Sequence, residues 1–223
     1  STKEIINEIN TYRDESKAAF LPRFFKTGKG EYGEGDQFIG VVVPNLRIVA
    51  KKHFDADFDT LRELLASPYH EYRLTALLAL TYRYAKLKDH TSRETCVNFY
   101  VSQVDAINNW DLVDLSCYKI LGHWLFDKDK QLLYDWAKEN HLWKQRIAMI
   151  SCMHFVKQGE FKDALAIADL LQHHPHDLIH KAVGWILREI GKEDEQLLVD
   201  YLTPRYKEMP RTMLRYAIER FEE

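Results

Sequence analysis

Helical periodicity runs almost from one end of the chain to the other, and more polar helical segments alternate with more apolar ones. A helix brings residues three and four apart onto one face. The more polar, amphipathic segments cover residues 57–67, 92–104, 128–140, 161–173 and 192–202. The more apolar segments cover residues 71–87, 108–126, 142–156, 176–191 and 210–221. This alternation predicts pairs of helices in which one member is largely buried.

The five apolar segments can be aligned with one another. The alignment begins at Arg73, Asp111, Arg146, Lys181 and Arg211. These starts lie roughly 30–40 residues apart, which is the spacing of helical-pair repeats. We therefore predict an all-α fold, an α-solenoid of HEAT-like repeats that forms a single domain over residues 1–223. The second helix of each pair is expected to line a concave face.

Composition agrees with a helical protein and narrows its class. Nine Gly and six Pro among 223 residues are too few for a turn-rich β-sandwich or barrel. The formal net charge of −3 does not by itself indicate a nucleic-acid partner. No stretch has the apolar length of a membrane span, and residues 1–20 lack the apolar centre of a signal peptide. The three Cys form no CxxC, so they are expected to be reduced and buried in a cytoplasmic protein.

Two segments depart from the helical pattern. The glycine-rich stretch 27–44 has neither a P-loop pattern nor a dinucleotide-binding frame, so we predict a loop, with Pro44 in the first turn of the next helix. The stretch 172–180 contains four His, and His176 and His180 have the spacing of two metal ligands on a helix. No third ligand lies at a standard spacing, so an inter-repeat turn is favoured. No metal or other cofactor is predicted.

The aligned repeats place basic residues at equivalent positions. Arg73, Arg146, Lys181 and Arg211 all begin apolar helices. A column of cations beside helix N-termini is suited to binding phosphates. Local capping or pairing between repeats would produce the same spacing, so both interpretations stay open.

The segment "NNWDLVDL" places Trp110 and Asp114 one helical turn apart on one face. Asp111 is expected to stabilise the first turn of that helix. Trp185 lies on the apolar helix two repeats later. A carboxylate beside aromatic rings is costly to bury without a partner, but it suits a ligand that carries a positive charge. The residues alone also allow a purely structural role for this pair.

Four segments resemble motifs of one known family. "FIGVVVPNLRIVAKKHF" is similar to a G-[VI]-x-x-P-x-x-R segment and "NNWDLVDL" to a W-D-x-V-D motif. "LWKQRIAMI" is similar to W-x-x-R-x-A-I, and "LIHKAVGWILREIGK" to K-A-[IV]-G-W-x-L-R-E. Over nearly its whole length the chain resembles the AlkD-type DNA alkylation repair glycosylases, which are built of HEAT-like repeats.

The resemblance implies a function and a set of roles. The family removes cationic N3- and N7-alkylated purines from double-stranded DNA by hydrolysis of the N-glycosidic bond, in base excision repair and without base flipping. Asp114 matches the catalytic carboxylate, and Trp110 and Trp185 match the aromatic residues that contact the lesion-bearing backbone. Arg146 matches an arginine that contacts DNA near the lesion. The other members of the basic column, Arg73, Lys181 and Arg211, are then expected to bind DNA as well.

Two alternatives to this enzyme stay open. One is a DNA-binding protein of the same family with weak or no catalysis. The other is a protein-binding helical scaffold, which is a common use of HEAT-like stacks. In either case we expect a monomer without a metal, a cofactor or a membrane attachment, located in a bacterial-type cytosol.

Overall fold

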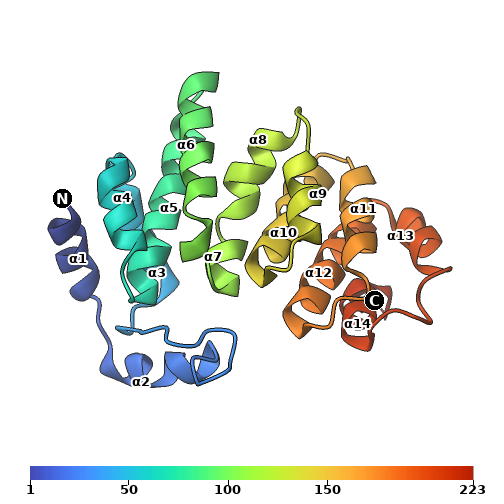
Figure 1. Ribbon diagram of the computed structural model, residues 1–223, viewed down its shortest axis with the longest axis horizontal. Helices are drawn as coiled ribbons and strands as arrows, with labels where there is room; N and C mark the ends of the chain where they lie inside the picture. The colour runs from blue at the N-terminus through green and yellow to red at the C-terminus, as the bar shows by residue number, and fades with distance from the viewer. Residues whose placement is uncertain (223) are drawn as a thin grey trace. The chain divides into compact units, whose positions relative to one another are not determined.

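The computed structural model describes residues 1–222, and these residues form helices, turns and loops without a β-strand. A single isolated β-bridge joins Gln37 to Tyr69. The chain divides into two compact units, Ser1–Ser116 and Cys117–Glu223, whose helices are labelled in Figure 1. The all-α prediction is confirmed, and the prediction of one domain over the whole chain stays a prediction.

The first unit is organised around one long buried helix. Its elements are α1 (Thr2–Asn10), α2 (Glu15–Phe24), α3 (Val43–Lys52), α4 (Phe58–Leu65), α5 (His70–Lys86), α6 (His90–Ser102), η1 (Val104–Ala106) and α7 (Trp110–Asp114). Both α3 and α4 pack against α5. Side-chain oxygens of Asp14, Asp57 and Asp89 accept hydrogen bonds from backbone N–H groups and so begin α2, α4 and α6. The predicted start of α3 is confirmed, because Pro44 lies in its first turn.

Helix α5 is apolar almost all round, as its sequence predicts. Its buried side chains include the run from Leu74 to Leu80. It also buries Glu71 and Arg73 in its first turn. Burying a charged side chain is unfavourable unless it is paired and hydrogen-bonded. These two residues must therefore find partners inside the unit.

In the second unit, more exposed helices again pair with more buried ones. Its elements are η2 (Tyr118–Gly122), α8 (His123–Leu125), α9 (Gln131–Lys138), α10 (Leu142–Lys157), α11 (Lys162–Leu171), α12 (Asp177–Glu193), α13 (Glu195–Leu202), α14 (Arg211–Ala217) and η3 (Glu219–Glu222). Helix α12 packs against both α10 and α14, and each of α9, α11 and α13 packs against a more buried partner, α10 or α12. The predicted pairing, in which one helix of each pair is largely buried, is seen here.

Helices α12 and α14 lie side by side and run in the same direction. A Cβ placed on Gly184 would lie 2.6 Å from the Met213 carbonyl oxygen and 2.5 Å from Tyr216 Cβ. One turn after Gly184, Arg188 forms an ion pair with Glu219, which lies two residues past the end of α14. Because the two contacts follow the same order along both segments of the chain, the two helices are parallel. Only glycine allows them to approach this closely at position 184.

The prediction of one continuous helix over 108–126 is wrong. The structure instead has α7, a turn at residues 115–116, the π-helical segment η2 and the short α8. The Ser116 hydroxyl donates to the Leu112 carbonyl oxygen at 2.6 Å and lies 2.7 Å from the Tyr100 hydroxyl. A side chain that bonds the preceding turn in this way bends a helix. As a result α7 is only five residues long.

Candidate functional site

Helix α7 carries the Trp–Asp pair, meaning Trp110 and Asp114, at its two ends. The Asn109 side chain accepts a hydrogen bond from the Trp110 backbone N–H at 2.8 Å and so begins the helix. Both members of the pair are half-buried. Residues four apart on a helix lie on one face. The structure therefore places an indole ring and a carboxylate one turn apart, as the sequence predicts.

The Trp110 indole has a defined orientation. Its ring stacks on Phe25 with centroids 5.2 Å apart and planes 20° from parallel. Phe24 meets the same indole edge-on at 6.0 Å. Aromatic pairs in these geometries stabilise one ring arrangement. The side chain is therefore held in place by α2 and the residue that follows it.

A buried network of charged side chains contacts α7 through Asp111. His70 Nδ1 is 2.6 Å from Asp36 Oδ2, and His70 Nε2 is 2.7 Å from Asp111 Oδ2. The His70 side chain is only 2% exposed. Asp111 does lie in the first turn of α7, as predicted, but its carboxylate binds the imidazole of another helix. No sequence pattern predicted that His70 or Asp36 would be part of the site.

The two carboxylates keep His70 protonated. Burial alone would lower the pKa of its imidazole, but the negative charge and hydrogen bond of Asp111 raise it, and Asp36 adds to this effect. The pKa rises from the usual 6.5 to about 9. Each ring nitrogen then carries a proton to donate, which matches two acceptor-only partners.

Arg73 belongs to the same network. Its Nη2 lies 2.9 Å from Asp36 Oδ1 and donates to Asn108 Oδ1 at 3.2 Å. Its Nη1 donates to the Ser67 carbonyl oxygen at 3.2 Å. Because the residue is 5% exposed, local pairing describes Arg73 better than the predicted phosphate contact does.

The glycine-rich segment is a loop, as predicted, and it is firmly anchored. The Glu71 carboxylate accepts hydrogen bonds from the backbone N–H groups of Ile39, Gly40 and Val41, at 2.7 Å for Gly40. Gly40 has a φ of +85°, and a Cβ there would lie 2.0 Å from the Asp14 carbonyl oxygen. These N–H groups are occupied by a carboxylate of the protein itself. The loop therefore serves to position Asp36 and its neighbours.

In the second unit, Trp185 and Lys181 lie one turn apart on α12. Trp185 is half-buried and follows Gly184, the glycine that packs against α14. Lys181 Nζ is 3.1 Å from Asp177 Oδ2, and both side chains are well exposed. Exposed pairs of this kind contribute little. The ammonium group of Lys181 therefore stays accessible to an anion.

Arg146 is placed differently from Lys181. It lies on α10, is 5% exposed, and its Nη1 donates to the Leu178 carbonyl oxygen of α12. It therefore connects two neighbouring helices of its unit. The structure supports a local role for Arg146, and its contact with DNA stays a prediction.

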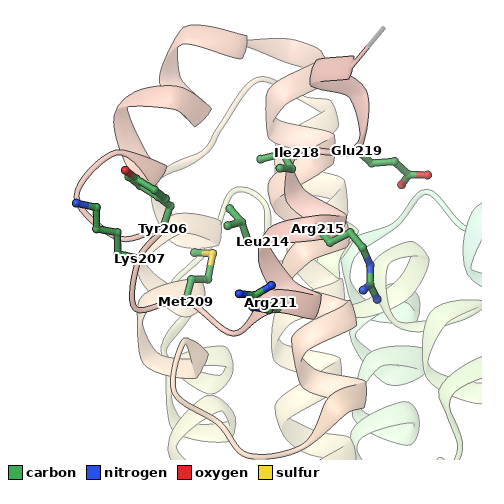
Figure 2. Close-up of a pocket in the computed structure, with 8 residues that line it drawn as sticks. All are labelled: Tyr206, Lys207, Met209, Arg211, Leu214, Arg215, Ile218 and Glu219. Atoms are coloured by element: carbon green, nitrogen blue, oxygen red, sulfur yellow. The ribbon is translucent and has the colours of Figure 1, made fainter.

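Arg211 borders a pocket of about 560 Å³ at the C-terminal end of the second unit. Figure 2 shows this pocket between α14 and the preceding turn. Its lining residues are Tyr206, Lys207, Met209, Arg211, Leu214, Arg215, Ile218 and Glu219. Arg211 and Arg215 are exposed, and neither forms an ion pair within residues 1–222. Arg215 was not predicted as a site residue, although it occupies the position equivalent to Trp185 in the repeat alignment.

The histidine-rich stretch forms a turn between helices, as favoured from the sequence. His176 caps α12 by accepting a hydrogen bond from the Leu178 backbone N–H at 3.0 Å. His180 Nε2 lies against the His174 carbonyl oxygen. Across residues 1–222 no cluster of three or more His, Cys, Asp or Glu side chains is arranged to hold a metal ion. In the same range no helix has the length and apolarity needed to cross a bilayer.

Two solved structures share the fold of this chain. One is a predicted DNA alkylation repair enzyme from Enterococcus faecalis, with a TM-score of 0.72 at 14% identity over 95% of this chain and 97% of that chain. Another is AlkD2 from Streptococcus mutans, with a TM-score of 0.57 at 15% identity over 92% and 98% of the two chains. At these identities the likeness shows the fold alone. No curated protein sequence matches the chain significantly.

A family model gives the assignment that structural likeness cannot give. The model described as "DNA alkylation repair enzyme" matches residues 5–221, which is nearly the whole chain and spans both units. The match includes the segments that carry Trp110, Asp114, Arg146 and Trp185. The chain therefore belongs to the DNA alkylation repair enzyme family.

Proposed function

We propose that the protein is a DNA glycosylase that hydrolyses the N-glycosidic bond of cationic N3- and N7-alkylated purines in double-stranded DNA. The observation that carries the proposal is the Trp–Asp pair on α7 in a member of a DNA alkylation repair family. An indole ring and a carboxylate one turn apart suit a substrate that develops positive charge.

The chemistry requires little beyond a placed carboxylate. Alkylation at N3 or N7 gives the purine a formal positive charge, so the base leaves as a neutral molecule and needs no general acid. Cleavage leaves positive charge on the deoxyribose, as in the oxocarbenium-like transition states of glycoside hydrolysis. Asp114 stabilises this charge electrostatically and orients the attacking water.

The aromatic residues complete the proposed site. Trp110 and Trp185, one in each unit, each carry a π face that can contact DNA, and cation–π attraction contributes about 0.5–2 kcal/mol per contact. Stacking on Phe25 holds the Trp110 ring ready for this contact. Because Arg73 and Arg146 are buried, we assign the attraction of phosphates to exposed cations such as Lys181 and Arg211.

The test is single-turnover release of N7-methylguanine from alkylated duplex DNA by the wild-type protein and by Asp114→Asn. We expect release by the wild type and a loss of about 10²–10³-fold in the variant. DNA affinity should hold or rise, because the substitution removes a negative charge that faces phosphates. DNA binding without any release would indicate the non-catalytic alternative, and no DNA binding at low salt would indicate a protein scaffold. Unchanged release by a folded variant would exclude Asp114 as the catalytic group.

A further inference from the structure

We propose that His70 is a positioning residue for α7. By joining Asp36 to Asp111, it fixes the helix that carries the Trp–Asp pair in the orientation that base excision needs. The inference rests on the proposed function for its activity readout. It rests on the geometry of the first unit alone for its structural readout.

Helix α7 cannot hold its own position. It has five residues, and helices this short are unstable without tertiary contacts. Its second residue, Asp111, is buried and bonded to His70 through Oδ2 at 2.7 Å. The other carboxylate oxygen, Oδ1, has no hydrogen-bond partner among residues 1–222. The bond to His70 is therefore the polar contact that ties this carboxylate to the rest of the unit.

His70 in turn is fixed from its other side. Its Nδ1 is bonded to Asp36 at 2.6 Å, and Asp36 is also paired with Arg73. Asp36 belongs to the loop that Glu71 anchors through three backbone N–H groups. The imidazole thus connects an immobilised loop to a short helix that needs support.

The charges of the side chains that bond one another around His70 balance. Asp36 and Asp111 supply two negative charges, and His70 and Arg73 supply two positive ones. The neighbouring carboxylate of Glu71 is also buried, but it is bonded to the backbone N–H groups of the loop. The apolar rings of Phe25 and Phe38 pack on the imidazole, with centroids 4.8 Å and 4.6 Å away. Deprotonation of His70 would leave an excess negative charge in a dry setting. It would also remove one of the two N–H donors, and the carboxylate left without a donor would be repelled.

A second physical connection runs from His70 to the Trp–Asp pair. Phe25 contacts the His70 ring and also stacks on Trp110, with centroids 5.2 Å apart. A shift of the imidazole therefore reaches α7 both through Asp111 and through the ring beneath Trp110. Misplacement of a catalytic group by about 1 Å costs on the order of 100-fold in rate.

The experiment compares His70→Gln with the wild type. Glutamine has one amide donor group and no charge, so it cannot replace the two charged donors. We expect single-turnover release of N7-methylguanine to fall roughly tenfold to a hundredfold, with DNA affinity unchanged. The ratio of the wild-type rate to the variant rate should also fall as pH rises through about 9, because any titration of the substrate itself affects both proteins equally. A role in stability alone would move neither the rate of folded protein nor this pH profile.

The structural readout uses 5-fluorotryptophan and fluorine NMR, with the Trp110 and Trp185 signals assigned from Trp110→Phe and Trp185→Phe. We expect His70→Gln to shift or broaden the Trp110 signal and to leave the Trp185 signal unchanged. The matched control is His53→Gln. His53 lies at the end of α3, and its Nε2 is 3.0 Å from a single carboxylate, that of Glu8 on α1. The control should alter neither signal nor the rate.

Should His70→Gln fail to fold, the double variant His70→Gln, Asp111→Asn keeps a neutral amide pair and permits the same measurements. An unchanged Trp110 signal together with unchanged release in a folded variant would overturn the inference. A shifted Trp110 signal in a protein that releases no methylated base would sustain the positioning role and reject the proposed function instead.

Discussion

Raising the pH should destabilise the protein through His70. The folded-state pKa of His70 is raised from 6.5 to about 9 because two carboxylates bond its ring in a buried setting. A group whose pKa is raised by folding stabilises the folded state fully below its unfolded pKa. That contribution is lost as the pH rises through the folded pKa.

The size of the effect follows from the shift. One pKa unit corresponds to about 1.36 kcal/mol, so a shift of this size contributes about 3 kcal/mol to the free energy of unfolding near pH 6. Nearly all of it should be lost by about pH 9.5. Since domains are commonly stable by only about 5–15 kcal/mol, this loss is readily measured. The side chain is almost fully buried, so little of the effect is screened by solvent.

The assay is urea denaturation followed by circular dichroism at several pH values from about 6 to 9.5, for the wild type and for His70→Gln. The upper limit stays below the range in which Tyr134 and Tyr201 ionise, because burial and hydrogen-bonded carboxylates raise the pKa of both phenols. The difference in unfolding free energy between the two proteins should shrink by about 3 kcal/mol across this range. A difference that stays constant with pH would refute a charged His70 between two carboxylates.

Two further predictions concern the second unit. Gly184→Ala should lower the free energy of unfolding by about 1–3 kcal/mol, because the added methyl group meets the α14 backbone. Chemical denaturation measures this change, and an unchanged midpoint would contradict the close packing of the two helices. Arg211→Ala and Arg215→Ala should each reduce the slope of log affinity for duplex DNA against log salt by about 1, because each removes one phosphate contact. Lys138→Ala on α9 is the matched control, because Lys138 is also exposed. If Lys138→Ala reduced the salt slope as much as the two arginine variants do, the prediction that α14 binds phosphates specifically would be wrong.

The helices could be predicted because their signal is local. Each amphipathic or apolar segment repeats its pattern within a few turns, and the boundaries of α4, α10 and α12 lie within a few residues of those expected. The break after α7 could not be predicted in the same way. It depends on Ser116, whose hydroxyl bonds both the preceding turn and Tyr100 on another helix.

The charge network could not be predicted because its partners are distant in sequence. Asp36 and His70 are 34 residues apart, and His70 and Asp111 are 41 apart. Repeat position was also misleading for Arg73, since the alignment does not reveal that the first turn of α5 is buried. A signal was nevertheless present, because charged residues in the first turn of an otherwise apolar helix require buried partners.

The two tryptophans of the proposed site depend on their surroundings in different ways. Trp185 lies within a helix of 17 residues that packs against neighbours on two sides, so its backbone is held by extensive apolar burial. Trp110 lies on a helix of five residues that buries only two apolar side chains, Leu112 and Val113. One cap, one buried carboxylate and one aromatic stack add polar or geometrically specific contacts, which fix orientation more sharply than apolar packing alone does. A change near α7 should therefore disturb the proposed chemistry more than an equally destabilising change near α12 does.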